Sequence, residues 1–262
     1  MSIRFFVPAA IACAASWVSG ASTILYDGST NTAPGAQGWN SFTLGSTQTV
    51  GSGGTTLNTT LADALLAGYS RVDQSLSRAS GYTLRFDLRV VSENHSKPAA
   101  SNNPGTDAIA DRSGVNLIAL SSDLMGIELG FWQNEIWAQN DGLVKADPVL
   151  APAGTRFTHG EGAAFDTTAA VTRYDLTTIG NTYALYANGS FASPILTGAL
   201  RDYSNEGLVY DDANFLFVGD NTTSARGSFK LDFVELTSPV PEPAFTGSVA
   251  IAAAILARRR RA

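Results

Sequence analysis

The chain has one cysteine and two histidines among its 262 residues, and few charges. Cys13 lies in an apolar stretch near the N-terminus, so the rest of the chain can form no disulfide, thiolate metal site or cysteine nucleophile. His95 and His159 lie far apart and lack the two-histidine helical spacing of a zinc protease. We expect both histidines to be solvated loop residues.

Charged residues make up only 15% of the chain, and the formal net charge is −6. Because four arginines, Arg258 to Arg261, stand together near the C-terminus, the central body is more acidic than the whole. An acidic body is repelled by phosphate backbones, which excludes nucleic acid as a partner. With 44% hydrophobic residues, 25 glycines and 10 prolines, the chain can bury a core built from many short strands and turns.

Residues 1–21 have the features of a secretory signal peptide, which we expect to form an apolar helix. Arg4 supplies the positive start, an apolar stretch follows, and the small residues from Val18 to Ala21 suit cleavage after Gly20 or Ala21. A lipoprotein signal ending at Cys13 is the weaker alternative, since the residue three positions earlier is alanine, not leucine.

Residues 239–262 combine three features in order: Pro241-Glu242-Pro243, an uncharged apolar stretch at 244–257, and the arginines Arg258, Arg259, Arg260 and Arg261. This tail resembles the PEP-CTERM sorting domain. The resemblance implies transient insertion of an apolar transmembrane helix in the inner membrane, processing by the protease exosortase, and release to the cell surface or extracellular polysaccharide matrix. As a helix, 244–257 would span about 21 Å, less than the ~30 Å hydrocarbon core, which favours a transient tail over the alternative of a lasting anchor.

The body, residues 22–238, is dominated by strand patterns. Tyr82–Val90 alternates apolar and polar residues, and Gly227–Val234 does the same, so each should have one buried and one wet face. Further predicted strands are Ile24–Tyr26, Trp39–Leu44, Val115–Leu120, Gly126–Trp132, Glu135–Ala138, Val171–Thr177, Thr182–Ala187, Ile195–Leu200 and Phe215–Val218. Thr60–Gly68 has a hydroxyl N-cap, an acid three residues on and a closing glycine, which predicts one short helix.

Four segments of the body carry a family resemblance: Gly126–Trp132 with the following Glu135–Ala138, Tyr174–Leu176, the hairpin Asn181–Gly189, and Phe215–Ala225 with its Gly-Asp turn. Their order is similar to concanavalin-A-like (laminin-G-like) jelly rolls of bacterial surface proteins. The resemblance implies an all-β sandwich of two antiparallel sheets. The fold hosts lectins, glycosidases, adhesion modules and spacers, so it does not define the function.

Glycosidases of this fold need two facing carboxylates. The nearest pattern is Lys230 to Glu235, where a lysine replaces the first acid and Asp232 and Glu235 differ in parity. We therefore expect no enzymatic activity. The expected function is that of an exported structural or adhesive protein of the cell surface or exopolysaccharide, able to bind glycans. The alternative is a polysaccharide hydrolase or lyase.

Aromatic side chains that can stack on sugars and acids that can hold an ion complete the candidate sites. The sugar-binding candidates are Trp132, Trp137, Tyr203 and Tyr210. The ion that loop acids suit best is a structural calcium, and its candidate ligands are Asp211, Asp212, Asp220 and Asn221.

Overall fold

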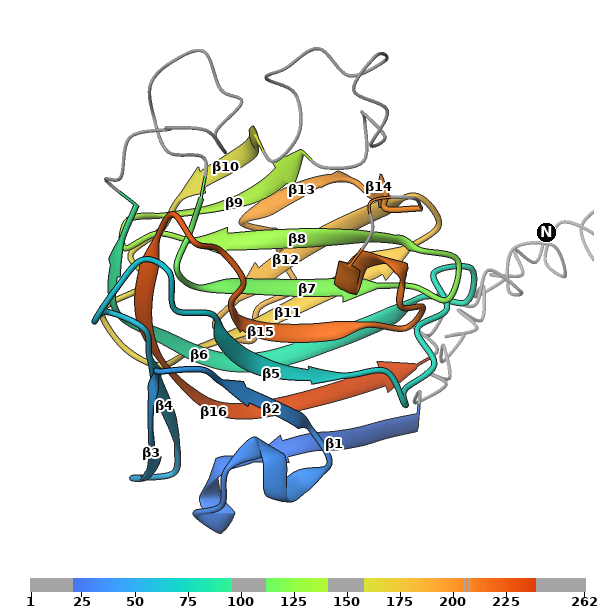
Figure 1. Cartoon of the computed structure of the whole chain (residues 1–262). Coiled ribbons are helices and arrows are strands. Elements are labelled where there is room, and N and C mark those ends of the chain that lie inside the picture. Colours follow the sequence, from blue (N-terminus) through green and yellow to red (C-terminus); the bar gives the residue numbers. More distant parts are fainter. Residues whose placement is uncertain (1–20, 96–111, 141–157, 205, 207, 239–262) are drawn as a thin grey trace, which may run out of the picture. The chain divides into compact units, whose positions relative to one another are not determined.

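The body is a sandwich of two antiparallel sheets (Figure 1). The structure, a computed structural model, describes residues 21–95, 112–140, 158–204, 206 and 208–238. The predicted all-β sandwich is therefore confirmed. The two expected terminal helices and the sorting motif lie outside the described residues. Among the described residues, no helix is long and apolar enough to cross a bilayer.

The first sheet has the strand order β13-β12-β11-β6-β16-β4-β3, with β1 also pairing with β16. Its strands are β1 (Ala21–Asp27), β3 (Thr47–Gly51), β4 (Gly54–Asn58), β6 (Tyr82–Asn94), β11 (Thr172–Ile179), β12 (Thr182–Ala187), β13 (Leu196–Ala199) and β16 (Arg226–Ser238). The long strands β6 and β16 pair over almost their whole length, from Arg226 opposite Asn94 to Thr237 opposite Thr83.

The second sheet has the order β10-β9-β8-β7-β15-β5-β2, with β14 also pairing with β8. Its strands are β2 (Asn40–Thr43), β5 (Ala67–Arg71), β7 (Asn116–Leu120), β8 (Met125–Phe131), β9 (Glu135–Asn140), β10 (Thr158–Ala164), β14 (Arg201–Asp202) and β15 (Leu216–Asp220). Three short 3-10 helices complete the described part of the chain: η1 (Gly28–Thr30), η2 (Pro34–Gln37) and η3 (Leu208–Asp211).

The core lies between the inner faces of the two sheets. Phe86 of β6 and Tyr174 of β11 stack with ring centroids 5.2 Å apart, and Phe131 of β8 meets Phe86 edge-on at 6.0 Å. All three rings are fully buried. Each such side chain contributes about 1.5–3 kcal/mol relative to an exposed position, so these alternating strands account for much of the fold's stability.

The predicted helix at Thr60–Gly68 is wrong, because long-range pairing overrides its capping signals. Ala67 and Gly68 begin β5 and pair with Asp220 and Gly219 of β15. The ring of Phe217 crosses Gly68 so closely that a Cβ there would stand 2.4 Å from Cε2. The side-chain oxygen of Asn58 accepts from the amide and the hydroxyl of Thr60, which forms a turn instead of a helix start.

At β7, the outer face of the second sheet is covered by other side chains of the protein. There, Ile118 and Leu120 point away from the core and pack with Tyr203, Tyr210 and Phe215 in a second apolar cluster. In Figure 1 the short helix η3 lies in front of β7. Burial on both faces explains why β7 is apolar or small along most of its length. The polar and aromatic groups of the same outer face lie toward β8, β9 and β10.

Candidate functional site

The candidate site is a cluster of four rings on the outer face of the second sheet. Trp137 on β9 pairs with Gly130 on β8, and its indole lies over that glycine. A Cβ on Gly130 would stand 2.6 Å from the indole Cε2, so only glycine admits this ring position. Among the described residues the buried indole Nε1 of Trp137 has no hydrogen-bond partner. An unpaired buried N–H is expensive, at about 1–3 kcal/mol, and such groups often mark functional positions.

Trp132 lies at the centre of this Trp–His cluster, which consists of His95, Trp132, Trp137 and His159. The ring centroid of Trp132 is 4.0 Å from that of His95, 5.4 Å from Trp137 and 5.3 Å from His159. His159 in turn stacks on Trp137 at 4.8 Å. Trp137 is fully buried, whereas the histidine side chains are 32% and 26% exposed. The surface of the cluster is therefore made by the two imidazoles.

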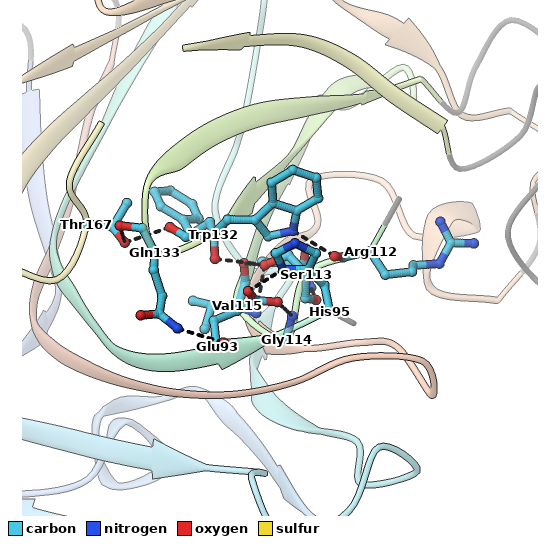
Figure 2. Close-up of polar contacts among 11 residues, drawn as sticks. Glu93, His95, Arg112, Ser113, Gly114, Val115, Trp132, Gln133 and Thr167 are labelled. Atoms are coloured by element: carbon cyan, nitrogen blue, oxygen red, sulfur yellow. Dashed lines mark hydrogen bonds and ion pairs between the residues drawn. The ribbon is translucent and has the colours of Figure 1, made fainter. Parts of the chain in front are cut away.

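Trp132 is fixed at three points, which makes it a rigid support. Its indole Nε1 donates to the carbonyl of Arg112 at 2.8 Å, and its carbonyl accepts from the Thr167 hydroxyl at 2.7 Å (Figure 2). Its backbone N–H donates to the carbonyl of Glu135. The side chain of Arg112 leads away from His95 and Trp132 in Figure 2.

His95 is held by a buried carboxylate. Its Nδ1 lies 2.7 Å from Oε2 of Glu93, whose side chain is only 1% exposed (Figure 2). The other oxygen of Glu93 accepts from the Gly114 amide at 3.3 Å. Burial raises the pKa of Glu93, and the bond from His95 opposes that shift. Because the carboxylate of Glu93 accepts a hydrogen bond from Nδ1–H, it favours the tautomer of His95 in which Nδ1 carries the proton and Nε2 the lone pair.

His159 is held at both ring nitrogens. Its Nε2 lies 3.0 Å from Oε1 of Glu135, and its Nδ1 lies 2.8 Å from the carbonyl oxygen of Gly160. It pairs with Gln139 at the start of β10. The expectation that both histidines are solvated loop residues is therefore wrong: one is in a strand, and both are partly buried against tryptophan.

A polar network lies beside the rings. Glu128 on β8 is buried and accepts from the Tyr210 hydroxyl at 2.6 Å and from the Asn221 amide at 2.8 Å. Asn116 on β7 donates to the side-chain oxygen of Asn221 at 2.8 Å. Burial raises the pKa of Glu128, while its two donors and the charge of Arg112 oppose the rise. The network anchors the segments of Tyr210 and Asn221 to the sheet.

The four aromatic residues predicted to bind sugars fall into two groups. Trp132 and Trp137 are in the Trp–His cluster, whereas Tyr203 and Tyr210 stack on each other at 5.0 Å within the apolar cluster over β7. All four are buried, so none offers an open ring face. Their role in sugar binding stays a prediction.

The predicted calcium ligands do not converge. Asp211 and Asp212 are exposed at the end of η3, while Asp220 and Asn221 bond to different partners. Asp220 accepts from the Thr59 hydroxyl at 2.5 Å and from the Thr222 amide, and burial raises its pKa to about 8. Across the described ranges no three acidic, histidine or cysteine side chains are grouped to hold a metal ion. A carboxyl so placed does not fit a calcium ligand.

The acids that hold the histidines were not among the candidates from the sequence. His95 was expected in a loop, but β6 continues to Asn94 and includes Glu93. The two-residue spacing of Glu93 and His95 places both side chains on one side of an extended chain, and this signal could have found the pair. Glu128 and Trp137 could similarly have been placed on the outer face by alternation along Gly126–Trp132 and Glu135–Ala138.

No family model matches the chain, and no curated protein matches it. Solved structures do. A conserved carbohydrate esterase from the Shiga toxin-encoding bacteriophage phi24B matches with a TM-score of 0.53 and 16% identity, covering 83% of this chain and 100% of that one. A Bacillus subtilis protein of unknown function with a galectin-like fold matches with a TM-score of 0.51 and 10% identity, covering 87% and 100%. At these identities the likeness shows the fold.

One sequence-based expectation is contradicted by this comparison. We expected a body without enzymatic activity because the paired carboxylates of glycosidases are missing. Since one chain of the same fold is a carbohydrate esterase, the lack of that one pair does not exclude enzymes. The parity argument also fails: a register shift between Leu231 and Phe233 leaves Asp232 outside the pairing, beside Lys230 at 2.8 Å.

Proposed function

We propose that the body recognises a carbohydrate chain at the Trp–His cluster. The observation that carries the proposal is the arrangement of the cluster, in which two buried indoles support two part-exposed imidazoles, each fixed by a glutamate. Sugars present apolar C–H faces with hydroxyls at their rims, and sites that combine apolar walls with a few oriented polar groups suit them. The fold supports the proposal, since a carbohydrate esterase and a protein with a galectin-like fold are among the similar structures.

The test is a glycan-array screen of the purified full-length chain, followed by titration calorimetry on any glycan bound. We expect binding that is lost in the variant Trp137→Ala and retained in Phe191→Ala, an exposed aromatic on another surface. If no glycan is bound, or if both variants bind equally well, the proposed site is wrong. Since Trp137 is buried, the unfolding temperature of each variant must be measured beside the binding.

The unfolding temperature also tests the predicted calcium ion. Its ligands do not converge in the described residues, so we expect the unfolding temperature to be the same in calcium and in chelator. A stabilisation by calcium that disappears in Asp211→Asn would support the sequence-based ligand set instead.

We further propose that the protein is exported by residues 1–21 and sorted by exosortase through residues 239–262 to the cell surface or the exopolysaccharide. The support is the resemblance of Pro241-Glu242-Pro243, the apolar stretch and the arginine cluster to PEP-CTERM tails. Mass spectrometry of the protein recovered outside the cells tests it. We expect peptides that end near Pro241 and lack Arg258–Arg261. An intact C-terminus on the mature protein would contradict the processing.

A further inference from the structure

The two histidines of the Trp–His cluster differ in what their ring nitrogens do. Both nitrogens of His159 face an oxygen acceptor, one on Glu135 and one on the backbone of Gly160. His95 uses only Nδ1, toward Glu93, and among the described residues its Nε2 has no hydrogen-bond partner. His159 is therefore bonded at both ring nitrogens, whereas Nε2 of His95 is left without a partner among the described residues on a side chain that is 32% exposed.

The orientation of His95 is fixed in two directions. Glu93 restrains the ring in its own plane through Nδ1, and Trp132 restrains it from one face, with ring planes 12° apart. Glu93 is itself held by the Gly114 amide, and the carbonyl of Glu93 accepts from the side chain of Gln133 at 2.9 Å. An imidazole that is oriented by a carboxylate at Nδ1 and has Nε2 unbonded among the described residues has the geometry of a general base.

We propose that His95 is the general base in hydrolysis of an acyl ester on the carbohydrate, with Glu93 as its positioning residue. This rests on the proposed carbohydrate site. Nε2 of His95 takes a proton from a water molecule as the water oxygen attacks the ester carbonyl carbon. The C–O bond of the tetrahedral adduct then breaks, and the imidazolium returns the proton to the leaving sugar oxygen. Ester and water give a carboxylic acid and a sugar hydroxyl, and the histidine is regenerated.

Other reactions fit these side chains less well. Glycoside cleavage needs two carboxyl groups facing one bond, but Glu93 and Glu128 are both buried and already bonded to protein donors. Among the described residues Ser113 is not suited to be a nucleophile, because its buried hydroxyl lies 2.9 Å from each of the carbonyl oxygens of Val115 and Phe131. Elimination from a uronate would need a cation beside the base, and the side chain of Arg112 leads away (Figure 2). Water is thus the nucleophile for which a single oriented base suffices.

The experiment measures acetate release by the full-length chain from O-acetylated xylan, O-acetylated alginate and p-nitrophenyl acetate. We expect turnover that falls by about 10²–10⁴-fold in His95→Gln, since a general base contributes that much. The control variant Phe191→Ala changes an exposed aromatic residue outside the cluster and should keep the rate within a few-fold. Glu93→Gln should have a lower turnover than the parent protein, because an amide facing Nδ1 no longer selects the tautomer.

A second readout does not depend on activity. Long-range proton–nitrogen NMR spectra of histidine-labelled protein should show His95 in the Nδ1–H tautomer, and Glu93→Gln should change that tautomer while the unfolding temperature remains high. Acetate release that is unchanged in His95→Gln would overturn the proposal. So would a chain that binds a glycan but releases no acetate from any of the three esters, an outcome that leaves the carbohydrate site standing. A chain that neither binds a glycan nor releases acetate would contradict both the general-base proposal and the proposed carbohydrate site.

Discussion

The imidazole of His95 lies nearly parallel to the indole of Trp132, with ring centroids 4.0 Å apart. The two residues come from segments far apart in the sequence, the end of β6 and the residue that follows β8. Their contact joins the two sheets at one end of the sandwich. The same contact orients Nε2 of His95, which has no hydrogen-bond partner among the described residues.

The stacking can be separated from the indole hydrogen bond by two substitutions of Trp132. Trp132→Phe keeps an aromatic ring beneath His95 and loses the bond to the Arg112 carbonyl, so we expect a loss of about 1 kcal/mol in the free energy of unfolding. Trp132→Leu removes the ring as well, and we expect a larger loss of about 2–4 kcal/mol. Urea unfolding of the two variants measures both; equal losses would mean that the stacked ring adds nothing.

Gly130→Ala tests the position of the Trp137 indole. The new Cβ would stand 2.6 Å from the indole, so the ring must move, and we expect a loss of about 1–3 kcal/mol together with weaker glycan binding. Gly35→Ala is the control, because its Cβ would meet nothing closer than the Ser41 side chain at 3.3 Å and the residue is exposed in η2. Thermal unfolding and calorimetric titration give the two results. An unperturbed Gly130→Ala protein would contradict the ring position.

Glu128 is predicted to be a structural anchor, which Glu128→Leu and Glu128→Gln can test. Leucine leaves the Tyr210 hydroxyl and the Asn221 amide without their acceptor, and each unpaired buried group costs about 1–3 kcal/mol. Glutamine keeps one acceptor and the shape, so its loss should be smaller, about 1 kcal/mol. Chemical unfolding of the two variants measures the difference. A leucine variant as stable as the parent would show that the network contributes no net stability.

The raised pKa of the buried Asp220 carboxyl predicts that the protein loses stability as the pH rises. Its folded pKa is raised by burial from 3.8 to about 8. Between these values the folded state holds a proton that the unfolded state has released, so the stability present below pH 4 is lost progressively up to about pH 8, on the order of a few kcal/mol. Unfolding temperatures from pH 4 to pH 9 should therefore fall less steeply for Asp220→Asn than for the parent. Glu93 and Glu128, whose pKa values are also raised, remain in both proteins. Parallel curves would contradict the assignment.

Much of the fold could be predicted because the strands have clear local patterns. The predicted strand Thr182–Ala187 has the observed bounds, and the alternation of Tyr82–Val90 correctly assigns Leu84, Phe86 and Leu88 to the core. The strand at Thr158–Ala164 could not be found in this way. It is rich in glycine and alanine and shifts register between His159 and Gly162, so only its pairing with β9 defines it.

The site was predicted only in part, because long-range strand pairing also brings its residues together. Trp132 and Trp137 could be proposed from residue type alone. The histidines could not, because what distinguishes His95 from His159 is the set of atoms around each ring, which strand pairing brings together across the chain. The end of β6 likewise depends on β16, which pairs with it as far as Asn94.

The first and last strands of the described body pair with each other, with Ala21 opposite Ser238. A force that pulls these two residues apart would unzip β1 from β16 one residue pair at a time and leave the core intact until late. A force applied at Ser238 alone would instead load β16 along its axis, where β6 and β4 resist it in shear. The 13-residue β16 extends about 40 Å from Ser238 to Arg226, beside the end of β6 that leads to His95. A body tethered through its C-terminal end would therefore carry its mechanical load at one end of that strand and present the ring cluster at the other.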